Sequence, residues 1–144
     1  MEVEIRRLGP GDEDAVRDAG RLFDAAPRPD ATRRFLAAPD HHLLIAYDAA
    51  GAPVGFVSGV ETTHPDKGTE MFLYELGVDE PVRRCGVGTA LVRALAALAQ
   101  ERGCHGMWVG AETGNEAAQR TYARAGARAT PPHVILEWPF AAPP

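Results

Sequence analysis

The segment from residue 76 to residue 91 has the composition of an anion-binding turn in front of a helix. It contains Gly86 and Gly88, with Arg83 and Arg84 before them and Thr89 directly after them. Amide N–H groups at the start of a helix have no partner inside the helix, so they can bind a phosphate that approaches closely. The glycines leave that approach open, and the arginines and the threonine hydroxyl add charge and a further donor. We therefore predict a pyrophosphate site at this turn.

The spacing of the two glycines also fits a purely structural explanation. Gly86-x-Gly88 lacks the third glycine of a dinucleotide-binding fingerprint, and the Gly-Lys-Ser/Thr sequence of a Walker loop does not follow it. A helix that starts close against a sheet needs small residues at the same places. Binding and packing therefore both remain open for this pair.

Two further side chains are candidates for moving a proton. Glu75 is the carboxylate in the apolar run from residue 71 to 78, where burial would raise its pKa toward the range of a general base. A residue that only pairs with an arginine, or only binds a cationic substrate, fits the same position. Tyr122 lies on a helical stripe with Ala118 and Ala125, where core packing is the usual role of a tyrosine. Asn115 stands where it would cap that helix.

Several acidic residues are candidates for binding a cationic substrate, because carboxylates attract ammonium groups and accept their hydrogen bonds. They are Asp79, Glu80, Glu112, Glu116 and Glu137. Solvated surface charge is the alternative for each of them. Glu112 and Glu137 are favoured as ligands because they lie at expected strand ends. The five histidines form no ligand cluster, so no metal site is predicted.

The elements that must hold these residues follow from hydrophobic periodicity and turn residues. Expected strands cover residues 3–8, 43–47, 54–60, 71–78, 107–111 and 134–138, and expected helices cover residues 12–26, 31–38, 87–102 and 115–125. No helix or strand is predicted for segment 61–70. This order predicts an α+β fold, with a mixed, largely antiparallel central sheet of about six or seven strands flanked by about four helices. Residues 1–144 contain no repeat or low-complexity linker and are expected to form a single domain.

Composition and charge limit the possible partners. The 144 residues are 45% hydrophobic, and 15 basic against 20 acidic side chains give a net charge of -5. That sign disfavours nucleic acid and anionic membranes and favours neutral or cationic partners. The sequence contains no apolar run long enough to span a bilayer and no secretory signal at its start, so we expect a cytoplasmic protein. Cys85 and Cys104 are expected to be free thiols.

The motif around the glycines resembles the cofactor site of a known enzyme family. Arg83-x-x-Gly86-x-Gly88 is preceded by Leu76-x-Val78 and followed by an alanine- and leucine-rich segment. This arrangement is similar to the acetyl-coenzyme A (acetyl-CoA) site of the GCN5-related N-acetyltransferases (GNAT).

The second half of the chain extends the resemblance. In the family an asparagine opens the helix after the next strand and a tyrosine follows within it, as Asn115 and Tyr122 do here. The similarity spans residues 70–127, and segments 72–78, 83–86, 90–91 and 110–122 resemble the aminoglycoside 3-N-acetyltransferase branch. The chain departs from the family pattern at Cys85, where glutamine, glycine or lysine is more usual, and in lacking the common phenylalanine after Tyr122.

The resemblance implies a GNAT-like fold and an N-acetyltransferase that uses acetyl-CoA. A splay or bulge in the central strand would let a backbone N–H reach the acetyl oxygen, and Gly77 would ease that distortion unless it is only a small residue under a packed helix. Glu75 would activate the substrate amine and Tyr122 would protonate the leaving thiolate. The expected cofactor contacts are Leu76, Gly77, Val78, Arg83, Arg84, Cys85, Gly86, Val87, Gly88, Thr89, Asn115, Ala118 and Tyr122. The expected substrate contacts are Glu75, Asp79, Glu112 and Glu137.

The acceptor that the resemblance implies is an aminoglycoside antibiotic, acetylated on its 3-amino group, which would confer resistance. The alternatives are acetylation of another amine, such as a polyamine, an amino-sugar or a protein N-terminus, and a non-catalytic regulatory module that binds acetyl-CoA. Neither a metal nor a nucleic acid is implied. Apolar residues in the last expected strand favour pairing of two chains into a homodimer.

Overall fold

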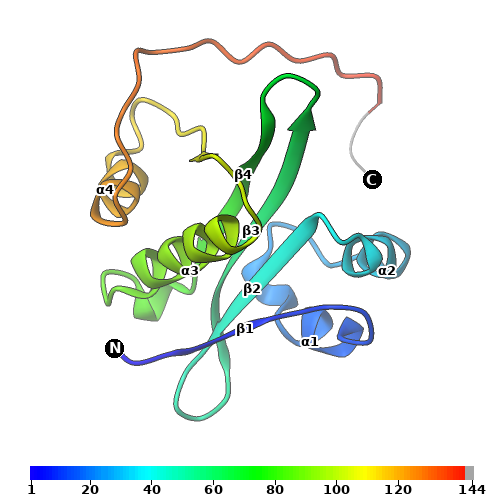
Figure 1. Ribbon diagram of the computed structural model, residues 1–144. Helices are drawn as coiled ribbons and strands as arrows, with labels where there is room; N and C mark the ends of the chain where they lie inside the picture. Colours follow the sequence, from blue (N-terminus) through cyan, green and yellow to red (C-terminus); the bar gives the residue numbers. More distant parts are fainter. Residues whose placement is uncertain (142–144) are drawn as a thin grey trace.

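A five-stranded sheet forms the centre of the molecule (Figure 1). The structure is a computed structural model and describes residues 1–141. The strands are β1 (Glu4–Arg7), β2 (His41–Tyr47), β3 (Pro53–His64), β4 (Gly68–Val78) and β5 (Met107–Trp108). They follow one another across the sheet in chain order, with β1 to β4 antiparallel and β5 parallel to β4. The predicted α+β fold with a mixed, largely antiparallel sheet is confirmed.

Helices cover both faces of this sheet. α1 (Glu13–Asp18), the 3-10 turn η1 (Gly20–Leu22) and α2 (Pro29–Ala37) pack on one face, and α3 (Val87–Glu101) and α4 (Glu116–Arg124) pack on the other. Because side chains alternate along a strand, β2 sends Leu43 and Ile45 into the α1–α2 core and Leu44 and Ala46 into the α3 core. In residues 1–141, no helix combines the length and the apolar character needed to cross a bilayer.

The first helix is shorter than the predicted 12–26. α1 ends at Asp18, and the chain continues through η1 into an irregular segment. This turn allows Phe23 to pack on Phe56, with ring centroids 4.6 Å apart. Gly20 allows the returning chain to approach, since a Cβ there would lie 3.2 Å from Pro27 Cδ. Tertiary packing therefore overrides helical periodicity in this segment.

The sheet has fewer strands than predicted, although its central hairpin is longer. Segment 134–138, expected as the last strand, pairs with no strand in the described chain, and β5 covers two residues of the expected 107–111. A suitable composition does not make a strand without a hydrogen-bonded neighbour. Segment 61–70, which had no predicted element, completes the β3–β4 hairpin around a turn with Gly68 at φ +76°.

β4 is irregular on both of its sides. The pairs Ser58–Glu75 and Gly59–Leu73 flank Tyr74, which has no partner in β3 and forms a β-bulge. On the other side, β4 pairs with β5 only over residues 71 and 72. The backbone of β4 from residue 73 to residue 78 therefore has no strand beside it on that side.

Candidate active site

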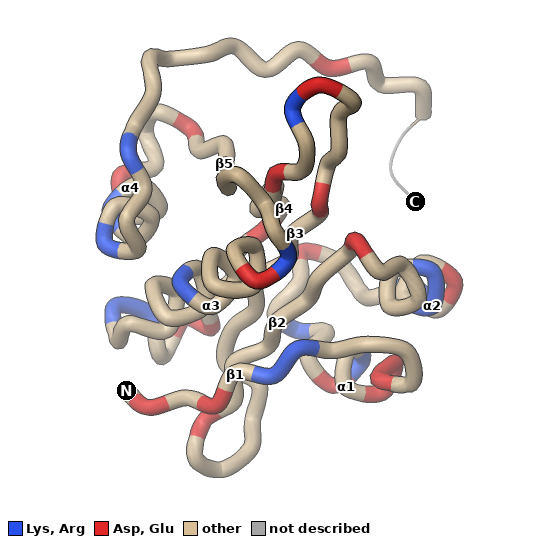
Figure 2. Tube along the Cα trace, in the orientation of Figure 1, with Lys and Arg blue, Asp and Glu red and all other residues tan. Residues whose placement is uncertain are grey.

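The turn before α3 is open and contains two residues with left-handed backbone. After the 3-10 turn η2 (Glu80–Val82), the chain passes through Arg84 at φ 66° and Gly86 at φ 86°, and α3 begins at Val87. A Cβ at Gly86 would meet no heavy atom within 4 Å. The bond from Ala90 N to Gly86 O, 3.0 Å, is the first of the helix, so the amides of its first three residues lack an intrahelical acceptor. Figure 2 shows a basic segment at this turn.

The second glycine of the motif serves packing. A Cβ at Gly88 would lie 3.3 Å from Thr121 Cγ2 of α4 and 3.5 Å from Val78 Cγ2 of β4. Arg83 donates from Nε to the Val78 carbonyl oxygen at 3.0 Å and fastens the turn to the end of β4. The two explanations of the motif therefore divide between its glycines: Gly86 leaves space in front of the helix, and Gly88 lets the helix approach its neighbours.

The end of β4 lies beside this turn. Leu76 and Val78 pack toward α3. A Cβ at Gly77 would lie 2.5 Å from Phe56 Cε1, so Gly77 makes room for that ring. The bulge expected near Gly77 lies instead at Tyr74. We call the backbone of the unpaired part of β4 and of the turn up to the first residues of α3, residues 73–89, the amide side of the site.

Glu75 faces the opposite layer, where Asp24 lies in the segment after η1. Burial raises the pKa of Glu75, and Asp24 raises it further through charge repulsion and a hydrogen bond. Asp24 is itself exposed, and the packing of Phe23 on Phe56 holds its segment against the sheet. A half-buried carboxyl beside a second carboxylate can bind an ammonium group and take its proton. We call Asp24 and Glu75 the carboxylate side.

Sequence reasoning missed Asp24. It lies inside the predicted 12–26 helix, where an acidic residue reads as part of a solvated face. Only the early end of α1 and the contact between Phe23 and Phe56 reveal its place beside Glu75. No local pattern could have identified it, because its neighbour is far away in the sequence.

α4 holds the expected asparagine and tyrosine. Asn115 Oδ1 accepts a hydrogen bond from Ala118 N at 3.1 Å, which confirms the predicted cap. Tyr122 packs partly buried on the α3 core, and burial raises the pKa of its phenol. Within residues 1–141 no group forms a hydrogen bond with the Tyr122 hydroxyl, which leaves it available to a ligand.

The other acidic candidates are spread over the molecule. Asp79 Oδ2 forms an ion pair with Arg21 of η1 at 2.7 Å, which ties the amide side to the α1–α2 layer. Glu112 is exposed in the turn before α4, where its carbonyl oxygen accepts from Asn115 N at 2.9 Å. Glu137 lies in the exposed segment after α4 and forms no ion pair in the described chain. The structure therefore does not bring the four expected substrate contacts together.

The remaining residues that were expected to contact the cofactor are either exposed in the turn or buried in the core. Arg84 and Cys85 are exposed in the turn, and both Cys85 and Cys104 are free thiols. Val87 is buried in the α3 core, so only its backbone is available. In the described residues, no three His, Cys, Asp or Glu side chains are grouped to hold a metal ion.

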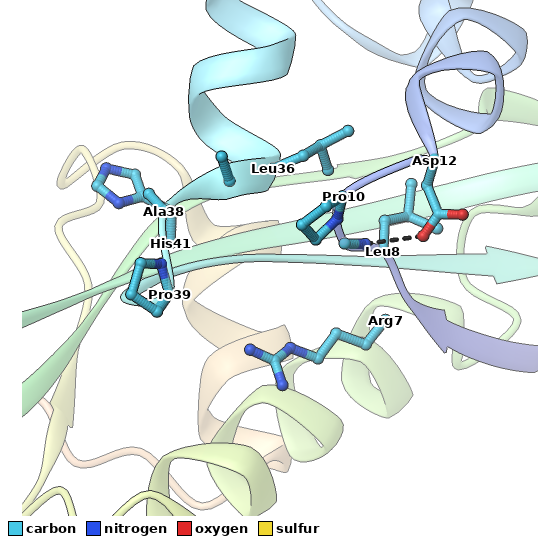
Figure 3. Close-up of a pocket in the computed structure, with 10 residues that line it drawn as sticks. Arg7, Leu8, Pro10, Asp12, Leu36, Ala38, Pro39 and His41 are labelled. Atoms are coloured by element: carbon cyan, nitrogen blue, oxygen red, sulfur yellow. Dashed lines mark hydrogen bonds between the residues drawn. The ribbon is translucent and has the colours of Figure 1, made fainter.

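A separate hollow of about 490 Å³ lies at the opposite, β1 edge of the sheet (Figure 3). Arg7 at the end of β1, Pro10 in the β1–α1 turn and Leu36 in α2 are among the residues that line it. The Asp12 carboxylate accepts from Gly9 N at 2.8 Å in its wall and makes no capping hydrogen bond to α1. The hollow shares no residue with the amide side or the carboxylate side.

Comparison with protein families gives one match over most of the chain. The model described as the acetyltransferase (GNAT) family matches residues 13–127. No curated protein sequence matches the chain.

Solved structures share the fold over nearly their whole length. Aminoglycoside acetyltransferase meta-AAC0020 from an uncultured soil metagenomic sample, in complex with sisomicin, is 19% identical with a TM-score of 0.87, covering 96% of this chain and 97% of that one. Aminoglycoside acetyltransferase HMB0005, also from a soil metagenomic sample, is 27% identical with a TM-score of 0.78, covering 96% and 99%. AAC(6')-Iy in complex with the bisubstrate analogue CoA-S-monomethyl-acetylneamine is 20% identical with a TM-score of 0.80, covering 96% and 99%.

Proposed function

This chain belongs to the GNAT acetyltransferase family, and from that premise we propose that it transfers the acetyl group of acetyl-CoA to an amine of an aminoglycoside antibiotic. The observation that carries the proposal is the open start of α3 beside the unpaired length of β4. A pyrophosphate fits the free amides of the helix start. An extended amide-containing arm fits the free backbone of a strand edge. Acetyl-CoA combines these two features in one molecule.

The residues of the amide side would hold this cosubstrate mainly by their backbone. Gly86 leaves space in front of the helix, Arg84 adds charge at the turn, and the edge of β4 offers N–H and C=O groups. Thr89, Asn115 and Tyr122 would contact acetyl-CoA through their side chains. Gly77, Gly88 and Arg83 support the site through packing or through the bond to β4.

Acetyl-CoA would supply a thioester carbonyl carbon that is open to attack by an amine. In the transfer, the amine nitrogen forms a bond to that carbon while the carbon–sulfur bond breaks. Glu75 accepts the proton that the substrate ammonium must lose. The Tyr122 hydroxyl donates a proton to the departing thiolate, and the second proton, which the nitrogen loses as the amide forms, restores the phenol through solvent. Glu75 faces the α1–α2 layer while Tyr122 packs on the α3 core, so the two groups serve amine and thiolate from different faces of β4.

The polycationic acceptor is supported by charge. Asp24, Glu75 and Asp79 lie on or next to the boundary between β4 and the α1–α2 layer, and the chain carries a net charge of -5. Carboxylates at such a boundary attract and orient a substrate with several ammonium groups. The solved structure of meta-AAC0020 with sisomicin, a protein of the same fold, adds support.

The position of acetylation is a separate proposal. The resemblance of segments 72–78 and 110–122 to the 3-N branch favours the 3-amino group. The similar structure named AAC(6')-Iy carries a 6' designation instead. NMR of acetylated sisomicin would show which nitrogen carries the acetyl group and would separate these two outcomes.

The proposed function is tested by coenzyme A release from acetyl-CoA with sisomicin and kanamycin as acceptors. Reactions without acceptor correct for hydrolysis and for the two protein thiols, and spermidine, glucosamine and a short peptide complete the panel. Saturable turnover of an aminoglycoside supports the proposal. Turnover of another amine alone contradicts the aminoglycoside acceptor. Tight binding of acetyl-CoA without transfer to any amine contradicts an enzyme and favours a regulatory module.

A further inference from the structure

Asp24 lies in a segment that has no backbone hydrogen bonding of its own. In the described chain, residues 24–27 neither donate nor accept a backbone hydrogen bond, and Asp24 is exposed. A loop without such bonds keeps one position only where its neighbours are anchored. The place of Asp24 beside Glu75 therefore depends on the residues that come directly before it.

The first anchor of this segment is apolar. Phe23 packs on Phe56 of β3, which pairs across the sheet with Gly77. Two residues further along β3, Ser58 pairs with Glu75. Because residues two apart on a strand share a face, Phe23 brings the segment onto the face from which Glu75 projects. Apolar packing is not directional, so this contact sets how close the segment lies and leaves it free to shift along β4.

The second anchor is polar and comes from Arg21 in η1. One nitrogen of its guanidinium group donates to the Pro53 carbonyl oxygen at 2.8 Å, and another lies 2.7 Å from Asp79 Oδ2. Pro53 begins β3 and Asp79 directly follows β4, so one side chain is bonded to the ends of two neighbouring strands. Hydrogen bonds from a planar guanidinium group fix direction as well as distance. Arg21 thus supplies the directional constraint that Phe23 lacks.

The strand ends that Arg21 contacts are held independently by the backbone. Asp79 N donates to the Val54 carbonyl oxygen at 2.8 Å, and the Asp79 carbonyl oxygen accepts from Val82 N at 3.0 Å. Neither bond involves the Arg21 side chain, so the turn before α3 keeps its shape without it. The constraint that Arg21 imposes therefore acts on the segment after η1.

We propose that Arg21 is a positioning residue, whose two contacts hold Asp24 beside Glu75 so that both carboxylates act together on the substrate ammonium group. This inference rests on the proposed function and adds a residue that does not touch the substrate. Without the two contacts, Asp24 moves into solvent and Glu75 faces the amine alone.

Arg21 acts through Asp24 and not through its own charge. Burial raises the pKa of Glu75 first, and the charge and hydrogen bond of Asp24 raise it further, whereas Arg21 does not contribute to the shift. Ser58, which lies opposite Glu75 in β3, is uncharged. In the described chain, Asp24 is thus the charged group through which a change at Arg21 reaches the Glu75 carboxyl.

The first test follows the Glu75 carboxyl group by carbon-13 NMR titration of the full chain, with Glu75→Gln to identify its resonance. Asp24→Asn should lower the pKa of Glu75 in the natural chain, because a negative neighbour is removed. In the Arg21→Ala chain, the same change should leave the pKa of Glu75 in place, because Asp24 has already moved away. An equal effect in both backgrounds, or no effect in either, would overturn the proposal.

Two further variants separate positioning from a general loosening of the layer. Arg17→Ala is the matched control, since Arg17 is an exposed arginine of α1 that pairs with Asp14 in the same helix. In this background, Asp24→Asn should have its full effect on the pKa of Glu75, and its loss there would assign the positioning to the whole layer and overturn the role of Arg21. Arg21→Lys keeps the charge but not the planar pair of donors, so it should restore only part of the effect.

The second test measures the transfer reaction. Arg21→Ala should raise KM for sisomicin about 10-fold, the loss expected for one charge-assisted hydrogen bond. KM for acetyl-CoA should stay near its natural value, because the turn keeps its backbone bonds. A rise in KM for acetyl-CoA alone would place Arg21 on the amide side and overturn the proposal. The NMR titration needs no turnover, so failure of the positioning role is distinguishable from failure of the proposed function.

Discussion

The amide side and the carboxylate side of the site are built in different ways. The amide side is one continuous stretch, residues 73–89, and its binding groups are mostly backbone N–H and C=O. The carboxylate side joins Glu75 to Asp24, which lies in another layer and is held there by packing of Phe23 on Phe56. Backbone binding needs only a local conformation and room, whereas a pair of side chains needs the whole fold to bring it together.

The two sides nevertheless share one core residue. The Phe56 ring lies against Gly77 on the amide side and against Phe23, one residue before Asp24. Because protein interiors are closely packed, a change at one contact of this ring is transmitted to the other. The comparison therefore predicts which substitutions act on one side alone and which act on both.

Removal of the Glu75 carboxylate should have the largest effect on catalysis, and this effect should be confined to the carboxylate side. Glu75→Gln keeps the shape of the side chain but cannot accept a proton, so kcat should fall by about 100-fold or more. KM for acetyl-CoA should stay near its natural value because the amide side is unchanged. Glu101→Gln, an exposed acid at the last position of α3, is the control. A kcat for Glu75→Gln close to that of the control would contradict the base role.

Gly77→Ala should weaken both sides by disturbing the shared ring. The new Cβ would lie 2.5 Å from Phe56 Cε1, and overpacking of this kind costs about 1–3 kcal/mol of unfolding free energy. Urea unfolding measures the loss. Gly110→Ala is the matched control, since a Cβ there meets nothing within 4 Å.

A double variant separates packing from other effects of the Gly77 change. Phe56→Leu removes the ring atoms that the new Cβ would meet. Phe56→Leu and Gly77→Ala together should therefore lose less stability than the sum of the two single variants. Strictly additive losses would show that the ring is not the cause.

Gly86→Ala should affect the amide side alone, and less strongly. An alanine held at φ 86° carries about 1–2 kcal/mol of conformational strain. If the turn changes shape to relieve this strain, KM for acetyl-CoA should increase roughly 10-fold. Gly51→Ala provides the control, because Gly51 has φ +83° and equally open surroundings in the β2–β3 turn, away from the site. Equal loss of stability in both variants with a change of KM in only the first would locate the cosubstrate at the turn. An unchanged KM in both would remove Gly86 from the site.

The same division explains how much could be predicted from the sequence. The order of elements, the main helix and the glycine turn all follow from local patterns, and the structure contains them. The end of α1 at Asp18, the bulge at Tyr74 and the unpaired segment 134–138 differ from prediction because each depends on a partner distant in the sequence.

A buried histidine shows the same limit. His42 is fully buried, with Nε2 2.6 Å from Glu61 Oε2 and Nδ1 2.9 Å from an Arg7 nitrogen. Glu61 belongs to the segment that received no predicted element. Neither its burial nor its partner is visible until β2 and β3 are paired, as at Asp24 and Glu75.

Asp24→Asn should have the smallest effect, and it tests whether the carboxylate side works as a pair. Burial is the main cause of the raised pKa of Glu75, and the charge and hydrogen bond of Asp24 add to it. Asparagine removes the charge, so the pKa of Glu75 should fall while burial still keeps it raised. A base must be deprotonated to act, so kcat declines as the pH falls through this pKa, and in the variant the decline should begin at lower pH. Asp30→Asn is the control, an exposed acid that does not contribute to the Glu75 shift. A pH profile of kcat that stays in place, or moves to higher pH, would mean that Asp24 does not act on Glu75 and that the base functions alone.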